Sequence, residues 1–226
     1  MNGRAALKGQ QLLGRALGPL MRTPMRMRRD QLTRLPLPPG RVLFLGDSIT
    51  EQGMWHEWFP SVPTLNRGVG GDTVQGVRQR LDSAVNQPRL ISLLIGTNDL
   101  GGLGTIKPPA LAAQFSDLVV ALRVLAPESV LVINSVMPRT PHFAPTIRDL
   151  NTRYQDIAIR EGARFLDLWP VLAGPDRGLK PEFTADNLHL NGAGYGAWTK
   201  ALAPVLDEVL AVPPAGRPSP AVESAS

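Results

Sequence analysis

The sequence contains no cysteine and only three histidines among its 226 residues. The absence of cysteine excludes disulfides, thiolate catalysis and Cys-based zinc sites. No apolar run reaches the roughly 18 residues of a membrane span, and charges interrupt the place where a signal peptide needs an apolar stretch. Neither GxGxxG nor the phosphate-cradling GxxxxGK[ST] occurs. We therefore expect a soluble, cytoplasmic protein without either of these nucleotide-binding loops.

Acidic residues are scarce in the N-terminal 40 residues, which hold eight Lys or Arg and one Asp, a local charge of +7. The remaining 186 residues carry a net charge of −2, so the pI of 10.2 describes a leader rather than a basic face on a domain. With aromatics at only 5%, this distribution argues against a nucleic-acid partner.

Three regions follow from composition. Residues 1–40 form a basic leader, residues 41–211 form one domain, and residues 212–226, rich in Pro, Ala and Ser, are expected to be disordered. On a helical wheel the basic residues Arg4, Lys8, Arg15 and Arg22 share one side. Two interpretations of residues 1–34 stay open: a loosely ordered leader, and an amphipathic helix that contacts an anionic membrane surface.

Between the two ends, apolar β-type runs alternate with helix-like stretches. Predicted strands lie at 42–45, 64–69, 90–95, 130–135 and 164–168, and predicted helices at 52–59, 73–85, 109–125, 146–161 and 193–210. Alternation of this kind is typical of βαβ units, in which helices cover both faces of a parallel sheet. The long connection from Trp169 to about Asn191 contains Asp186 and His189.

Ser48 is the first candidate for chemistry, because it directly follows the buried strand Val42–Leu45. Ligands of open parallel sheets bind at the carboxyl ends of the strands. A serine nucleophile needs a base, and the base needs an anion to orient it. His189 and Asp186, three residues apart, fit those two roles, although such pairs also arise by chance. His56 and His142 are interpreted as surface or loop residues.

Two further strand ends offer hydrogen-bond donors that an oxyanion would require. Gly70 and Gly71 follow the second strand, and Asn98 follows the third. Taken singly, a plain turn at the glycines and an Asx-turn or helix cap at Asn98 are the better interpretations.

The acidic neighbours of these segments have structural interpretations. Asp47 and Asp72 are expected to cap helix starts. Asp99 is expected to hold the loop that presents Asn98, and Glu51 and Glu57 are expected to face solvent.

Four segments, GDSIT at 46–50, GGDT at 70–73, GTND at 96–99 and DNLH at 186–189, together resemble the four ordered blocks of the GDSL or SGNH hydrolases. The resemblance spans residues 41–210. Within it, the stretches LNRGVGGDTVQGVRQRL and LHLNGAGY are similar to the branch that contains platelet-activating-factor acetylhydrolase catalytic subunits and related bacterial esterases.

This resemblance implies a three-layer α/β sandwich whose five-stranded parallel sheet has the flavodoxin-like order 2-1-3-4-5. It implies that Ser48, Asp186 and His189 form a catalytic triad, and that Ser48 N–H, Gly71 N–H and the Asn98 amide form the oxyanion hole. The implied reaction is hydrolysis of a short-chain, acetyl-like ester of a lipid or carbohydrate alcohol, without a metal or organic cofactor.

Two alternative functions remain. The chain can be a catalytically silent binding module on the same fold, or a nucleotide- or phosphate-binding α/β protein, although the latter lacks its usual motifs. Formation of a homodimer is also left open by the sequence.

Overall fold

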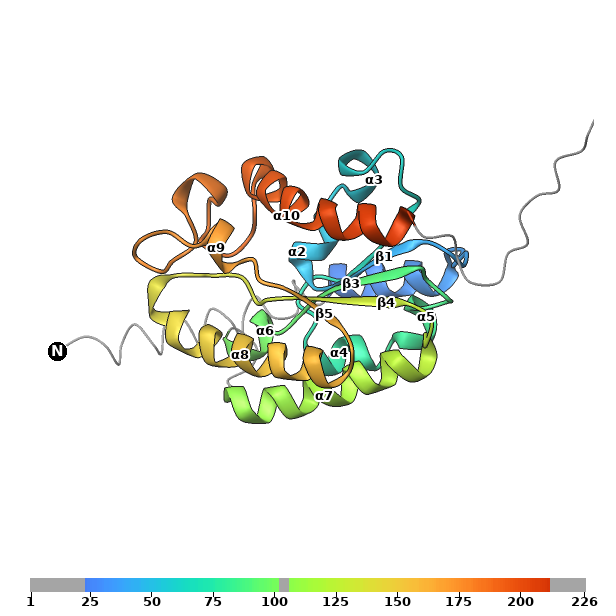
Figure 1. The fold of residues 1–226 in the computed structure, drawn as a ribbon, viewed down its shortest axis with the longest axis horizontal. Helices are drawn as coiled ribbons and strands as arrows, with labels where there is room; N and C mark the ends of the chain where they lie inside the picture. The colour runs from blue at the N-terminus through green and yellow to red at the C-terminus, as the bar shows by residue number, and fades with distance from the viewer. Residues whose placement is uncertain (1–22, 102–105, 212–226) are drawn as a thin grey trace, which may run out of the picture.

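The computed structural model describes residues 23–101 and 106–211 and is built on one five-stranded sheet (Figure 1). All four strand pairings are parallel, and the strand order is β2-β1-β3-β4-β5. The strands are β1 (Val42–Gly46), β2 (Thr64–Gly68), β3 (Leu90–Leu94), β4 (Val130–Asn134) and β5 (Arg164–Leu166). The expected fold class and strand order are therefore confirmed.

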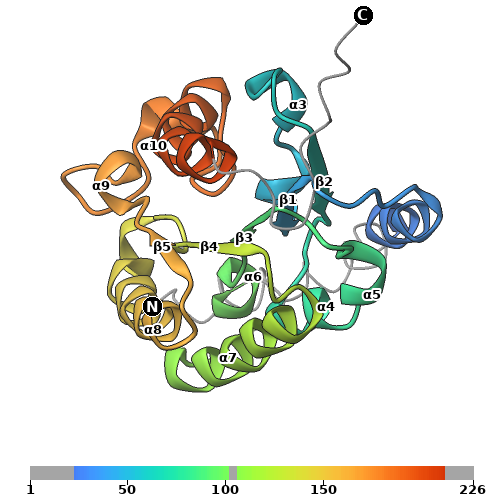
Figure 2. The same cartoon turned by 45° about the vertical axis from the view of Figure 1, so that its right-hand side comes forward.

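Helices cover both faces of the sheet, which gives three layers (Figure 2). One face packs against α4 (Val74–Arg78), α5 (Leu81–Ala84), α7 (Pro108–Leu125) and α8 (Ala144–Arg160). The other packs against α3 (Trp55–Trp58), α9 (Trp169–Leu172) and α10 (Gly192–Ala211). Further short elements are α2 (Ser48–Glu51), α6 (Thr97–Leu100) and two 3-10 turns, Pro141–Phe143 and Pro181–Phe183.

β1 shows why a central strand appears in the sequence as an unbroken apolar run. Its five residues are all buried, with Leu43 and Leu45 in the core on one face and Phe44 in the core on the other. The Phe44 ring stacks on Trp55 at a centroid distance of 3.9 Å, and Trp198 meets Trp55 edge-on at 4.8 Å. Because both faces are covered, no polar alternation is required.

α7 is long and apolar enough, by length and composition alone, to cross a membrane. In the fold, however, its residues Leu111, Phe115 and Leu118 are fully buried in the core beneath the sheet. Its apolar character is thus used in packing against β-strands and α8.

Two predicted helices differ from the structure. The expected helix at 52–59 is only α3, and helical structure starts earlier, at Ser48 itself. The expected helix at 73–85 is broken into α4 and α5. The break falls at Arg80, whose guanidinium turns inward to Asp72 (Nε to Oδ2, 2.6 Å) and to the Gly46 carbonyl (3.1 Å). A buried ion pair overrides helix continuity here.

A helix over residues 23–34 lies beside the β2 edge of the sheet, seen in blue in Figure 2. Arg28 donates to the carbonyls of Asn66 and Gly68, both in β2, at 3.3 Å each. Leu32 is buried against the domain. The expectations for residues 4–22 and for the tail at 212–226 fall outside the described residues.

Asn151 makes a testable contribution to stability. Its amide oxygen accepts from Val136 N–H (2.8 Å), and its amide nitrogen donates to the Val136 carbonyl (2.9 Å), tying α8 to the segment after β4. Asn151→Ala should lower the free energy of unfolding by about 2–4 kcal/mol, because it leaves two buried backbone groups unpaired. Urea unfolding measures this. The exposed neighbour change Thr152→Ala should cost less than about 0.5 kcal/mol, and equal losses would contradict the prediction.

Candidate active site

The loops that carry Ser48, Gly71 and Asn98 leave the sheet at the same level. Parallel register pairs Gly46 with Gly68 of β2 and with Leu94 of β3. Ser48, Gly71 and Asn98 therefore follow paired strand ends by two to four residues and meet at one edge, as expected for ligand sites in open parallel sheets. Gly46 also permits the tight exit from β1, because a Cβ there would collide with the Leu94 carbonyl.

The structure brings Ser48 and His189 together from 141 residues apart. Ser48 Oγ lies 2.9 Å from His189 Nε2, and His189 Nδ1 lies 2.6 Å from Asp186 Oδ2. A carboxylate can only accept, so Nδ1 carries the hydrogen, and Nε2 is left to accept from the Ser48 hydroxyl. The three side chains thus form one hydrogen-bonded chain that ends at the serine.

The loop that carries Asp186 and His189 is organised around the Asp186 carboxylate. Its Oδ1 accepts from the backbone N–H groups of Leu188 (2.9 Å) and His189 (2.8 Å). Partial burial, the largest influence, raises the pKa of Asp186, but the hydrogen bonds from the His189 ring and from these N–H groups together lower it to about 2. Asp186 is consequently an anion throughout the neutral range.

The loop opposite contains Gly70 and Gly71. Gly71 has a φ of +72°, which favours glycine. The Asn98 side-chain amide donates one hydrogen to the Asp72 carbonyl at 2.9 Å, so its second hydrogen is available to another acceptor. Asp99 accepts from Val74 N–H at 3.2 Å, which fits its expected structural role. The glycine loop lies beside Ser48, since a Cβ on Gly70 would lie 3.8 Å from Ser48 Cβ.

Two buried carboxyl groups lie behind the site. Burial is the main cause that raises the pKa of Asp47 to about 7, and the nearby carboxylates of Asp72 and Asp99 add to it, against a hydrogen bond from Ile49 N–H. Burial likewise raises the pKa of Asp99 to about 6. The Asp47 side chain accepts from Ile49 N–H at 3.0 Å, so its expected role as a helix cap is confirmed.

Two structural interpretations from the sequence are wrong. Asp72 does not cap α4, because Thr73 is the N-cap and accepts from Gly76 N–H. Asp72 is instead fully buried and paired with Arg80 and Arg29. Glu51 does not simply face solvent, since its carboxylate accepts from Gly70 N–H and pairs with Arg28 at 3.6 Å. Sequence reasoning missed both networks, although Glu51 follows Ser48 by one helical turn.

The other histidines stand apart from these contacts. His56 has a 76% exposed side chain that pairs only loosely with the exposed Glu57 (3.4 Å). His142 is exposed and contacts Thr140. Within residues 23–101 and 106–211, no three His, Asp or Glu side chains gather as metal ligands.

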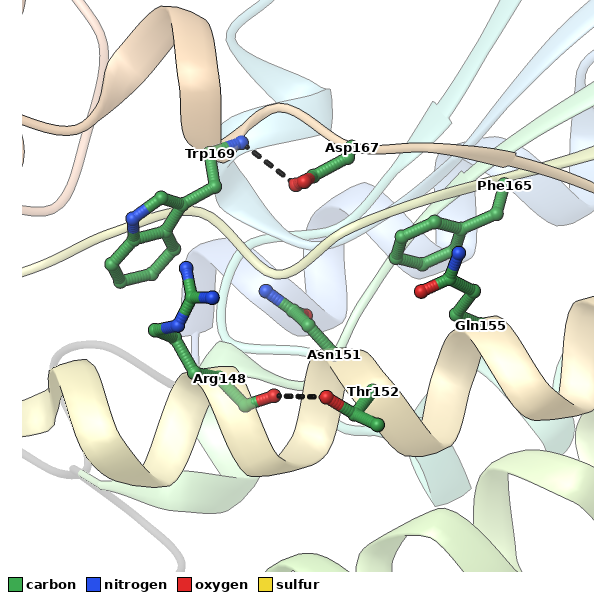
Figure 3. A pocket seen from close by; sticks show the side chains of 7 residues that line it. All are labelled: Arg148, Asn151, Thr152, Gln155, Phe165, Asp167 and Trp169. Carbon is green, nitrogen blue, oxygen red and sulfur yellow. Dashed lines mark hydrogen bonds between the residues drawn. The ribbon is translucent and has the colours of Figure 1, made fainter.

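A shallow cavity of about 90 Å³ lies elsewhere, between α8, β5 and the start of α9 (Figure 3). Arg148 reaches over the Trp169 ring there, 5.5 Å from its centroid. The side-chain amide of Asn151 is hydrogen-bonded to the Val136 backbone, and Asp167 accepts from Trp169 N–H. Ser48, Asp186 and His189 do not line this cavity.

A model of the GDSL-like lipase/acylhydrolase family matches residues 44–197, which includes all the site residues described above. The chain belongs to this family. The resemblance carried by the four sequence blocks is thereby confirmed, and membership of an acylhydrolase family supports ester hydrolysis as the chemistry.

Curated relatives and solved structures agree with this assignment. Platelet-activating factor acetylhydrolase IB subunit alpha1 from Pongo abelii is 29% identical over 182 residues, covering 75% of this chain and 77% of that protein. A Streptococcus pneumonia protein named as a platelet activating factor superposes with a TM-score of 0.74 at 26% identity, covering 91% of this chain and all of that one. An Axe2 mutant, an acetyl-xylooligosaccharide esterase from Geobacillus Stearmophilus, shares the fold, with a TM-score of 0.60 and 19% identity over 75% of this chain and 94% of that one.

The raised pKa of Asp47 predicts a pH-dependent stability. Its folded pKa of about 7 exceeds the unfolded value near 3.8, so the folded state holds an extra proton between these limits. The stability from this group is full below the unfolded pKa and is lost as pH rises through the folded one. In Asp47→Asn, which keeps the cap oxygen, the free energy of unfolding should rise relative to the unchanged protein by roughly 1 kcal/mol per pH unit between about pH 5 and 7.

Urea unfolding at several pH values measures this difference in the free energy of unfolding. The amide can also change stability by a constant amount, but that does not alter how the difference varies with pH. The control Asp82→Asn changes an exposed carboxylate in α5 and should give a curve parallel to the unchanged protein. Parallel curves for Asp47→Asn as well would contradict a raised pKa at Asp47.

Proposed function

We propose that this protein is a serine esterase that hydrolyses short-chain carboxylic esters through an acyl-enzyme. The observation that carries the proposal is the 2.9 Å separation of Ser48 Oγ and His189 Nε2, with Asp186 bonded to the other ring nitrogen. That arrangement is the one an otherwise unreactive hydroxyl requires in order to act as a nucleophile at neutral pH.

In the first half of the reaction, Ser48 Oγ attacks the ester carbonyl carbon while His189 Nε2 takes the hydroxyl proton. The carbonyl oxygen becomes an oxyanion, which accepts hydrogen bonds from Ser48 N–H, Gly71 N–H and the free amide hydrogen of Asn98. Ser48 is the first residue of α2, a position whose N–H has no partner inside the helix. The imidazolium then protonates the leaving alcohol, and the C–O bond to it breaks.

In the second half, water attacks the acyl-Ser48 carbonyl and gives its proton to His189 Nε2. The tetrahedral intermediate collapses, the Ser48 oxygen recovers the proton, and the carboxylic acid leaves. The ionised Asp186 stabilises the imidazolium in both halves and keeps the ring in the required tautomer. Three residues and the donor loops account for the whole cycle.

Acetyl is the acyl group we propose, on a larger alcohol such as a lipid or a sugar. Its support is the likeness to acetylhydrolase subunits, which extends over 75% of the chain. The link from β1 to β2 also adds only α2, α3 and short turns, without a large insertion over Ser48.

Ser48→Ala should lower kcat/KM for p-nitrophenyl acetate by at least about a thousandfold, because it removes the nucleophile while leaving the fold intact. Initial rates at neutral pH measure this. The matched control Ser61→Ala alters an exposed serine in the turn after α3 and should retain full activity. Equal turnover by the unchanged protein and Ser48→Ala would overturn the esterase proposal and favour a catalytically silent module.

Acyl preference is tested with a series of p-nitrophenyl esters. The acetyl ester should be hydrolysed with a kcat/KM about tenfold or more above that of the octanoyl ester, since one or two lost or misfitted methylenes already change transition-state binding by such factors. A rate that rises steadily with chain length would refute the acetyl assignment while leaving the esterase mechanism intact.

A further inference from the structure

The described helix over residues 23–34 turns one face toward the candidate site. Met25, Arg28, Arg29 and Leu32 are spaced by three, four and seven residues, so their side chains share that face. Leu32 is the buried member. Arg29 and Met25 contact the segment Gly70–Asp72, which contains the proposed oxyanion donor Gly71, and Arg28 pairs with Glu51, whose carboxylate accepts from Gly70 N–H.

Arg28 acts on this segment through Glu51. Its guanidinium lies 3.6 Å from Glu51 Oε1, while the other carboxylate oxygen of Glu51 accepts from Gly70 N–H. Glu51 is in α2, one turn after Ser48, so the same carboxylate connects the nucleophile helix with the residue before Gly71. Arg28 also donates to the Gly68 carbonyl, which fixes its position against β2.

Arg29 holds the other end of the segment. Its guanidinium pairs with Asp72 Oδ1, and Arg80 pairs with Oδ2. Asp72 has no exposed surface, so this carboxylate has lost its hydration and depends on the two arginines for compensation. Neighbouring arginines of one helix thus fix the residues on both sides of Gly71.

The Met25 side chain lies over Gly71. A Cβ placed on Gly71 would lie 2.8 Å from Met25 Cε and 3.0 Å from Sδ, so the thioether end covers Gly71 directly. The left-handed backbone at position 71 favours glycine, whereas the flexible end of Met25 can shift to admit a Cβ.

The helix is anchored by a buried cation of the domain. Arg67 in β2 is 2% exposed and donates to the carbonyls of Leu32 (3.0 Å) and Pro36 (2.8 Å). Without these two acceptors a desolvated guanidinium would lose bonds worth a large fraction of the domain's stability.

We infer that residues 23–36 belong to the catalytic unit, and that Arg28, through Glu51, is a positioning residue that orients the Gly71 N–H toward the oxyanion. The inference rests on the proposed esterase function. It gives a role to a segment that, judged by its charge alone, is only a basic leader. Loss of Arg28 should leave substrate binding intact and weaken only the stabilisation that develops in the transition state.

The test uses the full-length protein and p-nitrophenyl acetate. Arg28→Ala should lower kcat about tenfold with KM changed less than twofold, because a small displacement of a donor costs that much or more. Arg28→Lys, which keeps the charge for Glu51 but not the donor geometry, should give an intermediate kcat. Glu51→Gln combined with Arg28→Ala should be no slower than the slower single variant, because both act through one network.

The matched control is Arg26→Ala, an exposed arginine on the same helix, which should keep the kcat of the unchanged protein. If Arg28→Ala keeps the kcat of the unchanged protein and only its urea midpoint falls, the positioning role is overturned and Arg28 merely stabilises the fold. Ser48→Ala is run alongside: if it loses activity while Arg28→Ala does not, the esterase proposal stands and this inference falls. If Ser48→Ala and the unchanged protein are equally slow, the esterase proposal itself fails.

Discussion

The parallel register of β1 with its two neighbours is the constraint from which the site follows. Hydrogen bonding places Gly46 opposite Gly68 on one side and Leu94 on the other. Three loops must therefore begin at one level and at the strand spacing of about 4.8 Å. The chemistry of the loops is free to vary, but the positions of Ser48, the glycine pair and Asn98 relative to one another are fixed by backbone pairing.

A buried network then locks these loops together. Asp72 lies at its centre, joined through Arg80 to the Gly46 carbonyl and through its own carbonyl to Asn98. Removing charges from water costs several kcal/mol per ion, so such a network is a poor source of stability compared with apolar packing. Its value lies in geometry, because a carboxylate with several fixed partners permits one arrangement of the loop and disfavours the rest.

Sequence reasoning recovered what depends on local pattern and on recurring blocks. Apolar runs predicted most of the strands, and the recurring blocks predicted that His189 lies within hydrogen-bonding reach of Ser48 and Asp186 of His189. It failed where a long-range contact decides the outcome. Arg80 breaks the helix expected at 73–85 because it pairs with Asp72, and nothing in the spacing of apolar residues reports that pair.

The same limit applies to the net charge of the N-terminal 40 residues. Counting charges treats Arg28 and Arg29 as members of a solvated basic leader, yet their partners, Glu51 and Asp72, are acids of the domain. The N-terminal segment has an excess of positive charge and the domain that follows it has a small excess of negative charge. Two surfaces that bind one another through ion pairs produce this distribution when one follows the other in the sequence. The face spacing of Met25, Arg28, Arg29 and Leu32 was the available signal, because a helix with one continuous face of this kind needs a surface to pack against.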